Sequence, residues 1–206
     1  FELTTEQTEI VELAERILGD LADTAHVREV EESARAEGRE RLDERTWKAL
    51  AEAGLVAICV PEELGGSGFG LLEAALVLER IGRRVTPVPY LPAVVGGAMT
   101  VAAHGTDAQR SALLPAVLDG SSLVVPALGE PGNYVVPDEP ATTARDRGDG
   151  TLVLDGEKWF VPWARTASHL LVPASTSAGV EVLIVETGAA GVSFEVLDTT
   201  SGWPES

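Results

Sequence analysis

The sequence predicts an α+β multidomain chain, in which an all-α N-terminal domain is followed by an antiparallel β-sandwich or barrel. Apolar residues recur at helical spacing as far as Gly120, and beyond it they alternate in short runs separated by glycine turns. The 206 residues suffice for one large domain or two small ones with a buried core. We therefore expect a helical domain over residues 1–120 and a β domain over 121–206, incomplete at its C-terminal edge.

The composition excludes several classes of partner. The formal net charge of -18 argues against nucleic acid and anionic membranes. The chain shows neither a charged leader with an apolar core nor an apolar run of spanning length, which indicates a cytoplasmic location.

Cysteine and histidine usage predicts neither a metal site nor a nucleophile. The single cysteine, Cys59, lies between Ile58 and Val60 and is expected to be a buried, inert thiol. The 3 histidines lie far apart without ligand spacing.

Several helices are marked by their caps. The capping-box pattern of residues 4–7 opens an amphipathic helix, and Asp43 caps a short helix that Gly54 ends. The charged segment 26–41, which contains Gly38, predicts a solvated connection or a frayed helix.

The rest of the helical half is more apolar. Residues 71–83 are apolar almost all round, so that helix should be buried. The preceding glycine-rich segment 65–70 lacks the Lys-Ser or Lys-Thr pair of a phosphate cradle, which favours a structural loop. Pro92 can start the next helix, and a second capping box at residues 106–109 opens a helix that Gly120 closes.

The β half contains alternating segments bounded by turn residues. The expected strands are 123–128, 141–145, 151–155, 158–161, 170–172, 180–185 and 192–197. Asp155-Gly156 predicts a hairpin that joins 151–155 to 158–161. Residues 203–206 look like a cut or a disordered edge, although a tryptophan so near an end normally packs on something.

Residues 159–163 hold a concentration of flat apolar side chains. Trp159, Phe160 and Trp163 could form plain core or a platform for a flat, ring-shaped ligand. No nucleophile elbow or serine–histidine–aspartate grouping accompanies them. Composition and spacing alone lead no further than a soluble two-domain protein with an aromatic β surface.

The order of motifs resembles the acyl-CoA dehydrogenase family across essentially the whole chain. The matching segments are Phe1–Gln7, Trp47-x-x-Leu50-x-x-x-Gly54, Val60–Gly68, Leu78–Gly82, Gln109–Gly120, Ala127–Gly132 and Asp155–Pro162. This resemblance implies an FAD-dependent dehydrogenase with a helical domain, a middle β domain and a C-terminal four-helix bundle that is absent from this chain. In the family a glutamate of that bundle removes the α-proton of an acyl-CoA while a hydride passes to FAD, so no catalytic base can be named here.

The resemblance also implies partners and a site. Electron-transfer flavoprotein is the implied electron acceptor, and family members are oligomers. The implied cofactor-binding residues are Leu128, Gly129, Phe160, Val161 and Pro162.

Departures from the family pattern concern this same site. Gly129 and Pro162 replace hydroxyl residues, Phe160 replaces the tryptophan that packs on the flavin, and the acidic-serine motif tail is replaced by residues 133–135. Two lost hydroxyl contacts would weaken FAD binding by about 1–3 kcal/mol. The pattern, together with residues 85–89, resembles a bacterial branch that acts on bulky, sterol side-chain thioesters as paired unlike subunits. The alternative is a non-catalytic partner or an acyl-CoA-binding protein that has lost FAD.

Overall fold

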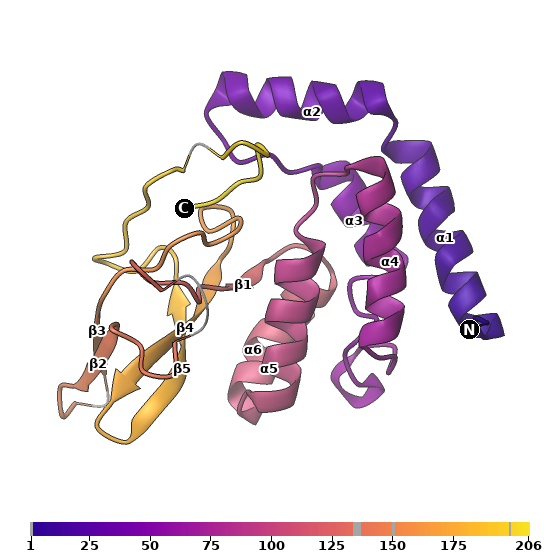
Figure 1. Cartoon of the computed structure of the whole chain (residues 1–206). Coiled ribbons are helices and arrows are strands. Elements are labelled where there is room, and N and C mark those ends of the chain that lie inside the picture. The colour runs from indigo at the N-terminus through magenta and orange to yellow at the C-terminus, as the bar shows by residue number, and fades with distance from the viewer. Residues whose placement is uncertain (1, 134–136, 150, 198) are drawn as a thin grey trace. The chain divides into compact units, whose positions relative to one another are not determined.

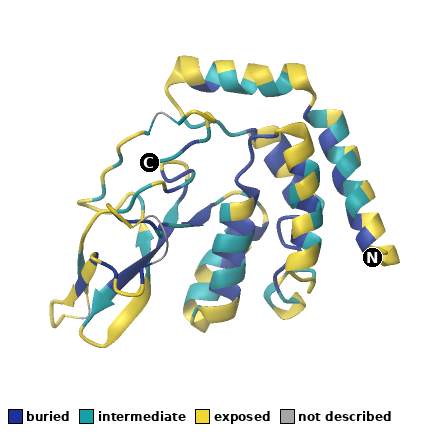
Figure 2. Cartoon of the chain, in the orientation of Figure 1, coloured by how far each residue is buried: buried dark blue, intermediate teal, exposed yellow. Residues whose placement is uncertain are grey.

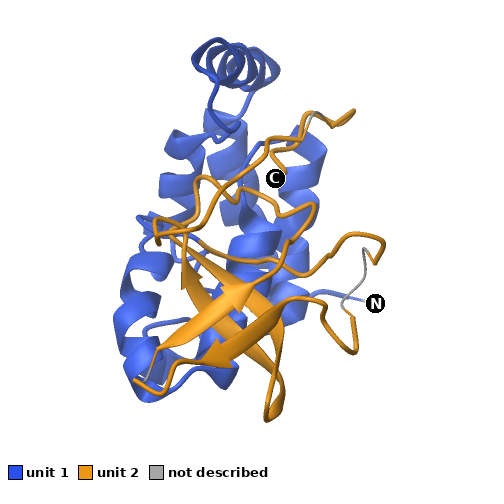
Figure 3. Cartoon of the chain, turned by 90° about the vertical axis from the view of Figure 1, so that its left-hand side faces the viewer, with its two compact units in different colours: residues 1–123 blue, residues 124–206 orange. Residues whose placement is uncertain are grey.

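The chain folds into two compact units, residues 1–123 and 124–206, in a computed structural model (Figures 1 and 3). The structure describes residues 2–133, 137–149, 151–197 and 199–206. Phe1 of the family-like lead and Tyr134 and Val135 of the motif tail lie outside the described residues, as does Gly150, which lies between the expected strands 141–145 and 151–155.

The first unit is helical in its described part. Its elements are α1 (Thr5–Leu21), α2 (Thr24–Glu37), α3 (Glu44–Glu52), the 3-10 turn η1 (Glu62–Leu64), α4 (Leu71–Arg84), the π-helical η2 (Leu91–Ala98), α5 (Met99–His104) and α6 (Asp107–Leu118). Both predicted capping boxes are present: the Thr4 hydroxyl accepts from Gln7 N–H, and the Thr106 hydroxyl from Gln109 N–H. The expected cap at Asp43 is confirmed as well.

Two helical expectations need correction. The charged segment is the regular helix α2, capped by Asp23 and closed by Gly38 in the left-handed conformation, although of its residues only Ala34 is buried (Figure 2). Helix α4 is amphipathic rather than buried all round: Ala74, Val77 and Ile81 are buried, and the helix packs against α1 and η2. At its start, Leu71 and Leu72 are 56% and 45% exposed.

Polar contacts fix the helices of this unit along with the apolar packing. The Gln7 amide donates to Glu73 at 2.8 Å and Arg80 pairs with Glu15 at 3.1 Å, which ties α1 to α4. The fully buried Tyr90 hydroxyl donates to the Leu55 carbonyl at 2.8 Å. Burial away from water raises the pKa of Tyr90 well above its ordinary value, so the phenol stays neutral.

The second unit is built on a five-stranded mixed sheet. Its strands are β1 (Val124–Pro126), β2 (Thr143–Asp146), β3 (Leu152–Asp155), β4 (His169–Thr176) and β5 (Gly179–Glu186). On one side β4 pairs in parallel with β1 and, at Ser175, with Thr143 of β2; on its other side it pairs antiparallel with β5 over its full length. A helical unit followed by a β unit is confirmed, but the sheet is mixed where we expected it antiparallel. The parallel pairs arise because β1 and β2 each reach β4 through a long connection rather than a hairpin.

The predicted hairpin at Asp155-Gly156 is wrong. Strand β3 pairs with β2, and residues 158–161 form no strand. A Cβ on Gly156 would lie 2.5 Å from the Thr142 hydroxyl and 2.7 Å from the Thr142 Cα, so glycine is required by close packing.

The expectations for the last segments are also corrected. Residues 192–197 form no strand. Residues 203–206 are not a loose edge: Pro162 forms a bridge with Glu205, and the Trp203 ring meets Trp163 edge-on at 5.1 Å between centroids.

Candidate functional site

Two segments of the second unit meet at the aromatic stretch. Trp159 N–H donates to the Gly129 carbonyl at 2.9 Å, which forms an isolated antiparallel bridge. Beside it, Lys158 Nζ donates to Glu130 Oε1 at 2.7 Å. The two segments are therefore joined through the backbone, over 30 positions, and through side chains, over 28.

Phe160, the next residue, combines backbone strain with exposure. Its φ is +57°, a left-handed conformation that costs a non-glycine residue about 1–2 kcal/mol. Phe160 is 44% exposed, and its ring contacts Trp159 edge-on at 6.0 Å between centroids. Strain of this kind persists only where surrounding structure enforces it, and it concentrates at functional sites.

The C-terminal segment holds the other side of Phe160. Val161 N–H donates to the Ser206 carbonyl at 2.8 Å, and Ser206 N–H donates back to Val161 at 3.1 Å. Trp163 N–H donates to Pro204 at 3.1 Å. Phe160 therefore lies between two backbone pairings, with Gly129 on one side and the chain end on the other.

The structure brings the five implied cofactor-binding residues into one neighbourhood. They differ in which groups they have left to contact a cofactor. Phe160 offers an exposed aromatic face, and no hydrogen bond of the Leu128 N–H is found in the described part of the chain. The Gly129 carbonyl and both backbone groups of Val161 already hold partners. Pro162 has no donor. The segment therefore presents one exposed aromatic residue, while hydroxyl donors at positions 129 and 162 are lacking.

Glu130 is a site residue that the sequence reasoning did not single out. Its carboxylate accepts from Lys158, from the Thr142 N–H and hydroxyl at 2.9 and 2.6 Å, and from Ala141 N–H at 2.6 Å. Burial by itself raises the pKa of Glu130, but the hydrogen bonds from these four donors lower it by more, so that the pKa falls to about 2. The acidic residue in the Gly129-Glu130-Pro131 motif was the available signal; nothing in the sequence marked Thr142.

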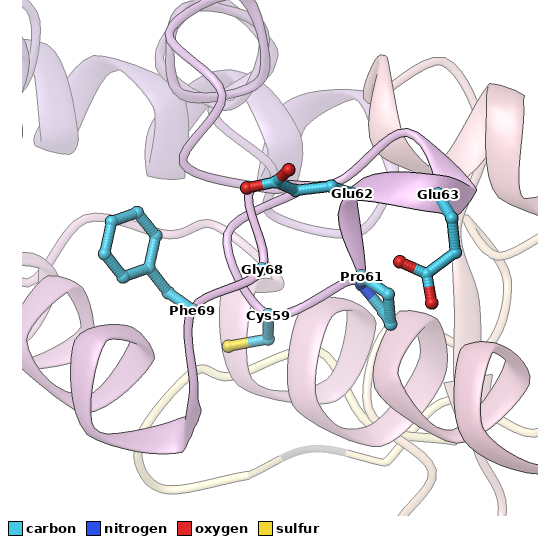
Figure 4. A pocket seen from close by; sticks show the side chains of 6 residues that line it. All are labelled: Cys59, Pro61, Glu62, Glu63, Gly68 and Phe69. Atoms are coloured by element: carbon cyan, nitrogen blue, oxygen red, sulfur yellow. The ribbon is translucent and has the colours of Figure 1, made fainter.

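The first unit carries a separate hollow of about 360 Å³ (Figure 4), lined by Cys59, Pro61, Glu62, Glu63, Gly68 and Phe69. The Cys59 thiol donates to the Gly70 carbonyl at 3.1 Å, and burial raises the pKa of Cys59 to about 11. The expected burial of Cys59 is confirmed, and the raised pKa agrees with the expectation of an inert thiol.

The glycine-rich loop beside this hollow is structural, as predicted. A Cβ on Gly66 would lie 1.9 Å from the Val60 carbonyl oxygen, so the loop folds directly onto the preceding run. Gly68 N–H donates to Val60 and Phe69 N–H to Ile58. Its amides serve the loop itself and do not line a phosphate site.

The described residues offer neither a metal site nor a helix that could span a membrane. No group of histidine, cysteine, aspartate and glutamate residues able to hold a metal ion occurs among the described residues. Within the same residues, every helix is too short or too polar to cross a bilayer.

Comparisons with known proteins agree with one another. The model of the acyl-CoA dehydrogenase N-terminal domain matches residues 4–121, and that of the middle domain matches residues 126–205. Acyl-CoA dehydrogenase FadE27 of Mycobacterium tuberculosis is 33% identical over 192 residues, which are 89% of this chain and 48% of FadE27. The chain therefore spans about half the length of this curated relative.

Solved structures give the same result. A variant of the Tcur3481-Tcur3483 steroid ACAD is 42% identical with a TM-score of 0.87, over 97% of this chain and 53% of that one. The ChsE4-ChsE5 complex from Mycobacterium tuberculosis is 30% identical with a TM-score of 0.86, over 99% and 53% of the two chains. An acyl-CoA dehydrogenase from Bacillus anthracis complexed with FAD is 25% identical with a TM-score of 0.82, over 99% and 35%. The chain belongs to the acyl-CoA dehydrogenase family, of which it carries the N-terminal and middle domains.

Proposed function

We propose that this chain forms part of an FAD-dependent acyl-CoA dehydrogenase that introduces an α,β double bond into an acyl-CoA thioester. The observation that carries the proposal is the strained, exposed Phe160, held beside Gly129 at the position where the family motif places its flavin-packing aromatic residue. Similarity to the FAD complex from Bacillus anthracis supports the cofactor.

The residues of this chain would hold and shield the cofactor. Phe160 would supply an apolar face against the flavin ring, and Leu128 a backbone donor to its polar edge. When bound, FAD supplies the hydride acceptor. Because the apolar ring of Phe160 covers one face, it would exclude water from that side. The base that removes the α-proton would come from outside these 206 residues.

We further propose that the chain works as one subunit of a heteromer on a bulky, sterol side-chain-like acyl-CoA. The structures named for a steroid ACAD and for the ChsE4-ChsE5 complex support this, since both resemble the chain over nearly its whole length. Electron-transfer flavoprotein is the proposed electron acceptor.

A second candidate is a non-catalytic partner subunit, or an acyl-CoA-binding protein, that has lost FAD. The lack of hydroxyl donors at Gly129 and Pro162, together with the engaged backbone of Val161, favours it. Both candidates predict acyl-CoA binding, so the presence or absence of bound FAD distinguishes them.

The test is the amount of FAD per chain in the full-length protein, purified alone and again with a co-expressed partner subunit. One FAD per chain in the protein alone supports a homomeric dehydrogenase, and FAD only in the paired preparation supports a heteromer. Bleaching of the flavin absorbance by a steroid side-chain acyl-CoA, followed by recovery with electron-transfer flavoprotein, would support the activity. Protein that binds acyl-CoA but no FAD in either preparation would refute the enzyme proposal.

A further inference from the structure

The Glu130 carboxylate joins three segments that are distant in sequence. Its Oε1 accepts from Lys158 Nζ at 2.7 Å and from Thr142, and its Oε2 accepts from Ala141 N–H at 2.6 Å. Lys158 belongs to the aromatic stretch, Glu130 to the motif that precedes it, and Ala141 and Thr142 to the lead into β2. One carboxylate therefore fixes the approach of all three.

The pair is buried to an unusual degree. The side chains of Lys158 and Glu130 are 9% and 4% exposed, and among the ion pairs of the described residues this is the one in which both are below one tenth. A buried ion pair adds little net stability, because desolvation offsets the attraction between the charges. What such a pair can supply is a single defined geometry, since any other arrangement leaves a buried charge without a partner.

The anchored residues directly precede Phe160 in the chain. Lys158 is anchored by Glu130, Trp159 N–H by the Gly129 carbonyl, and Phe160 follows in the left-handed conformation with an exposed ring. The Glu130–Lys158 pair thus holds the N-terminal side of the strained residue, while Ser206 holds its C-terminal side through Val161.

We propose that Glu130 and Lys158 are positioning residues, whose buried ion pair sets segment 158–160 against Gly129 and so orients Phe160 toward the cofactor. The last step of this inference, the orientation of Phe160 toward the cofactor, rests on the proposed function. Its first step, the ordering of segment 158–160, is independent of any ligand.

The experiment uses the full-length protein, with its partner subunit where FAD binding requires one. The variants are Lys158→Met, Glu130→Gln and the double variant Glu130→Gln/Lys158→Met. The control is Lys48→Met, which breaks the exposed Lys48–Glu52 pair, whose side chains are 75% and 69% exposed. Three quantities are measured: FAD affinity, thermal unfolding of the apo-protein, and hydrogen exchange of the peptide that contains residues 157–163.

Each single variant should weaken FAD binding by roughly tenfold or more, the size of loss found when residues that orient a metal's ligands are removed. Exchange in 157–163 should rise more than elsewhere in the apo-protein, and Lys48→Met should change neither quantity. The double variant carries no unpaired buried charge, so its unfolding temperature should recover toward that of the wild type. FAD affinity and local exchange should not recover, because the double variant still lacks the ion pair that holds segment 158–160 against Gly129.

Other results would overturn the inference. Full recovery of FAD affinity in the double variant, or exchange that rises uniformly over the second unit, would show that the pair contributes stability alone. Wild-type protein that never binds FAD would refute the proposed function and with it the cofactor step. In that case the exchange pattern would still decide whether the pair orders the segment.

Discussion

Phe160 and Trp163 have nearly the same φ angle and opposite surroundings. Their φ angles are +57° and +50°, which are unfavourable for both aromatic residues. Trp163 is 3% exposed and packs against Trp203, whereas Phe160 is 44% exposed. At Trp163 the burial of a large ring offsets the strain. At Phe160 little burial does so, which is why we assign its conformation to the presentation of the ring.

The largest expected effect follows from Trp163. Trp163→Ala removes a buried aromatic ring and leaves Trp203 without its edge contact, so the free energy of unfolding should fall by about 3–5 kcal/mol. Chemical denaturation monitored by circular dichroism measures it. A loss below about 1 kcal/mol would mean that packing does not hold this conformation.

Lys158→Met should loosen the backbone at Phe160 and leave the packing of Trp163 unchanged. Removing one partner of a buried pair costs about 3 kcal/mol at neutral pH. The pKa of Glu130 is lowered from 4.5 to about 2, so the stability that its charge contributes is present above pH 4.5 and lost as pH falls toward 2.

The pH dependence of this variant provides the measurement. Without Lys158 the folded-state pKa of Glu130 rises, so the difference in unfolding free energy between wild type and variant should shrink as pH falls from 4.5 to about 2. Urea titrations at several pH values would show it. A difference that stays constant with pH would mean that Lys158 acts through packing alone.

The sequence predicted the helical half well because its signals are local. Capping boxes at Thr4 and Thr106 and the cap at Asp43 act within four residues, and all three form as expected. The exposed start of α4 was not predictable from composition, because exposure of Leu71 and Leu72 depends on which side of the helix its tertiary neighbours cover.

The candidate site depends on contacts far apart in sequence. Residues 158–161 have the composition of a strand, yet pairing with Gly129 and Ser206 forces Phe160 out of extended geometry. The Glu130–Lys158 pair spans 28 residues and has no local signature. Resemblance to the family suggested the neighbourhood, and only the fold showed which backbone groups in it are already engaged.

Backbone strain can be separated from ring contacts at both positions by comparing glycine with alanine. Glycine adopts positive φ without the Cβ clash, so Phe160→Gly should be more stable than Phe160→Ala by about 1–2 kcal/mol. The difference between Trp163→Gly and Trp163→Ala should have the same sign and size. Equal stability of glycine and alanine at position 160 would contradict a strained native conformation there.

The smallest expected change in stability is that of Phe160→Ala. Phe160 is largely outside the core and meets Trp159 edge-on, so the free energy of unfolding should change by roughly 0.5–1 kcal/mol. FAD affinity should nevertheless fall, and Phe160→Trp, which restores the aromatic residue of the family motif, should retain or raise it. Fluorescence titration of the apo-protein with FAD measures both. If Phe160→Ala binds FAD as tightly as the wild type, the strained residue does not contact the cofactor, and its conformation must be explained by the two backbone pairings that flank it.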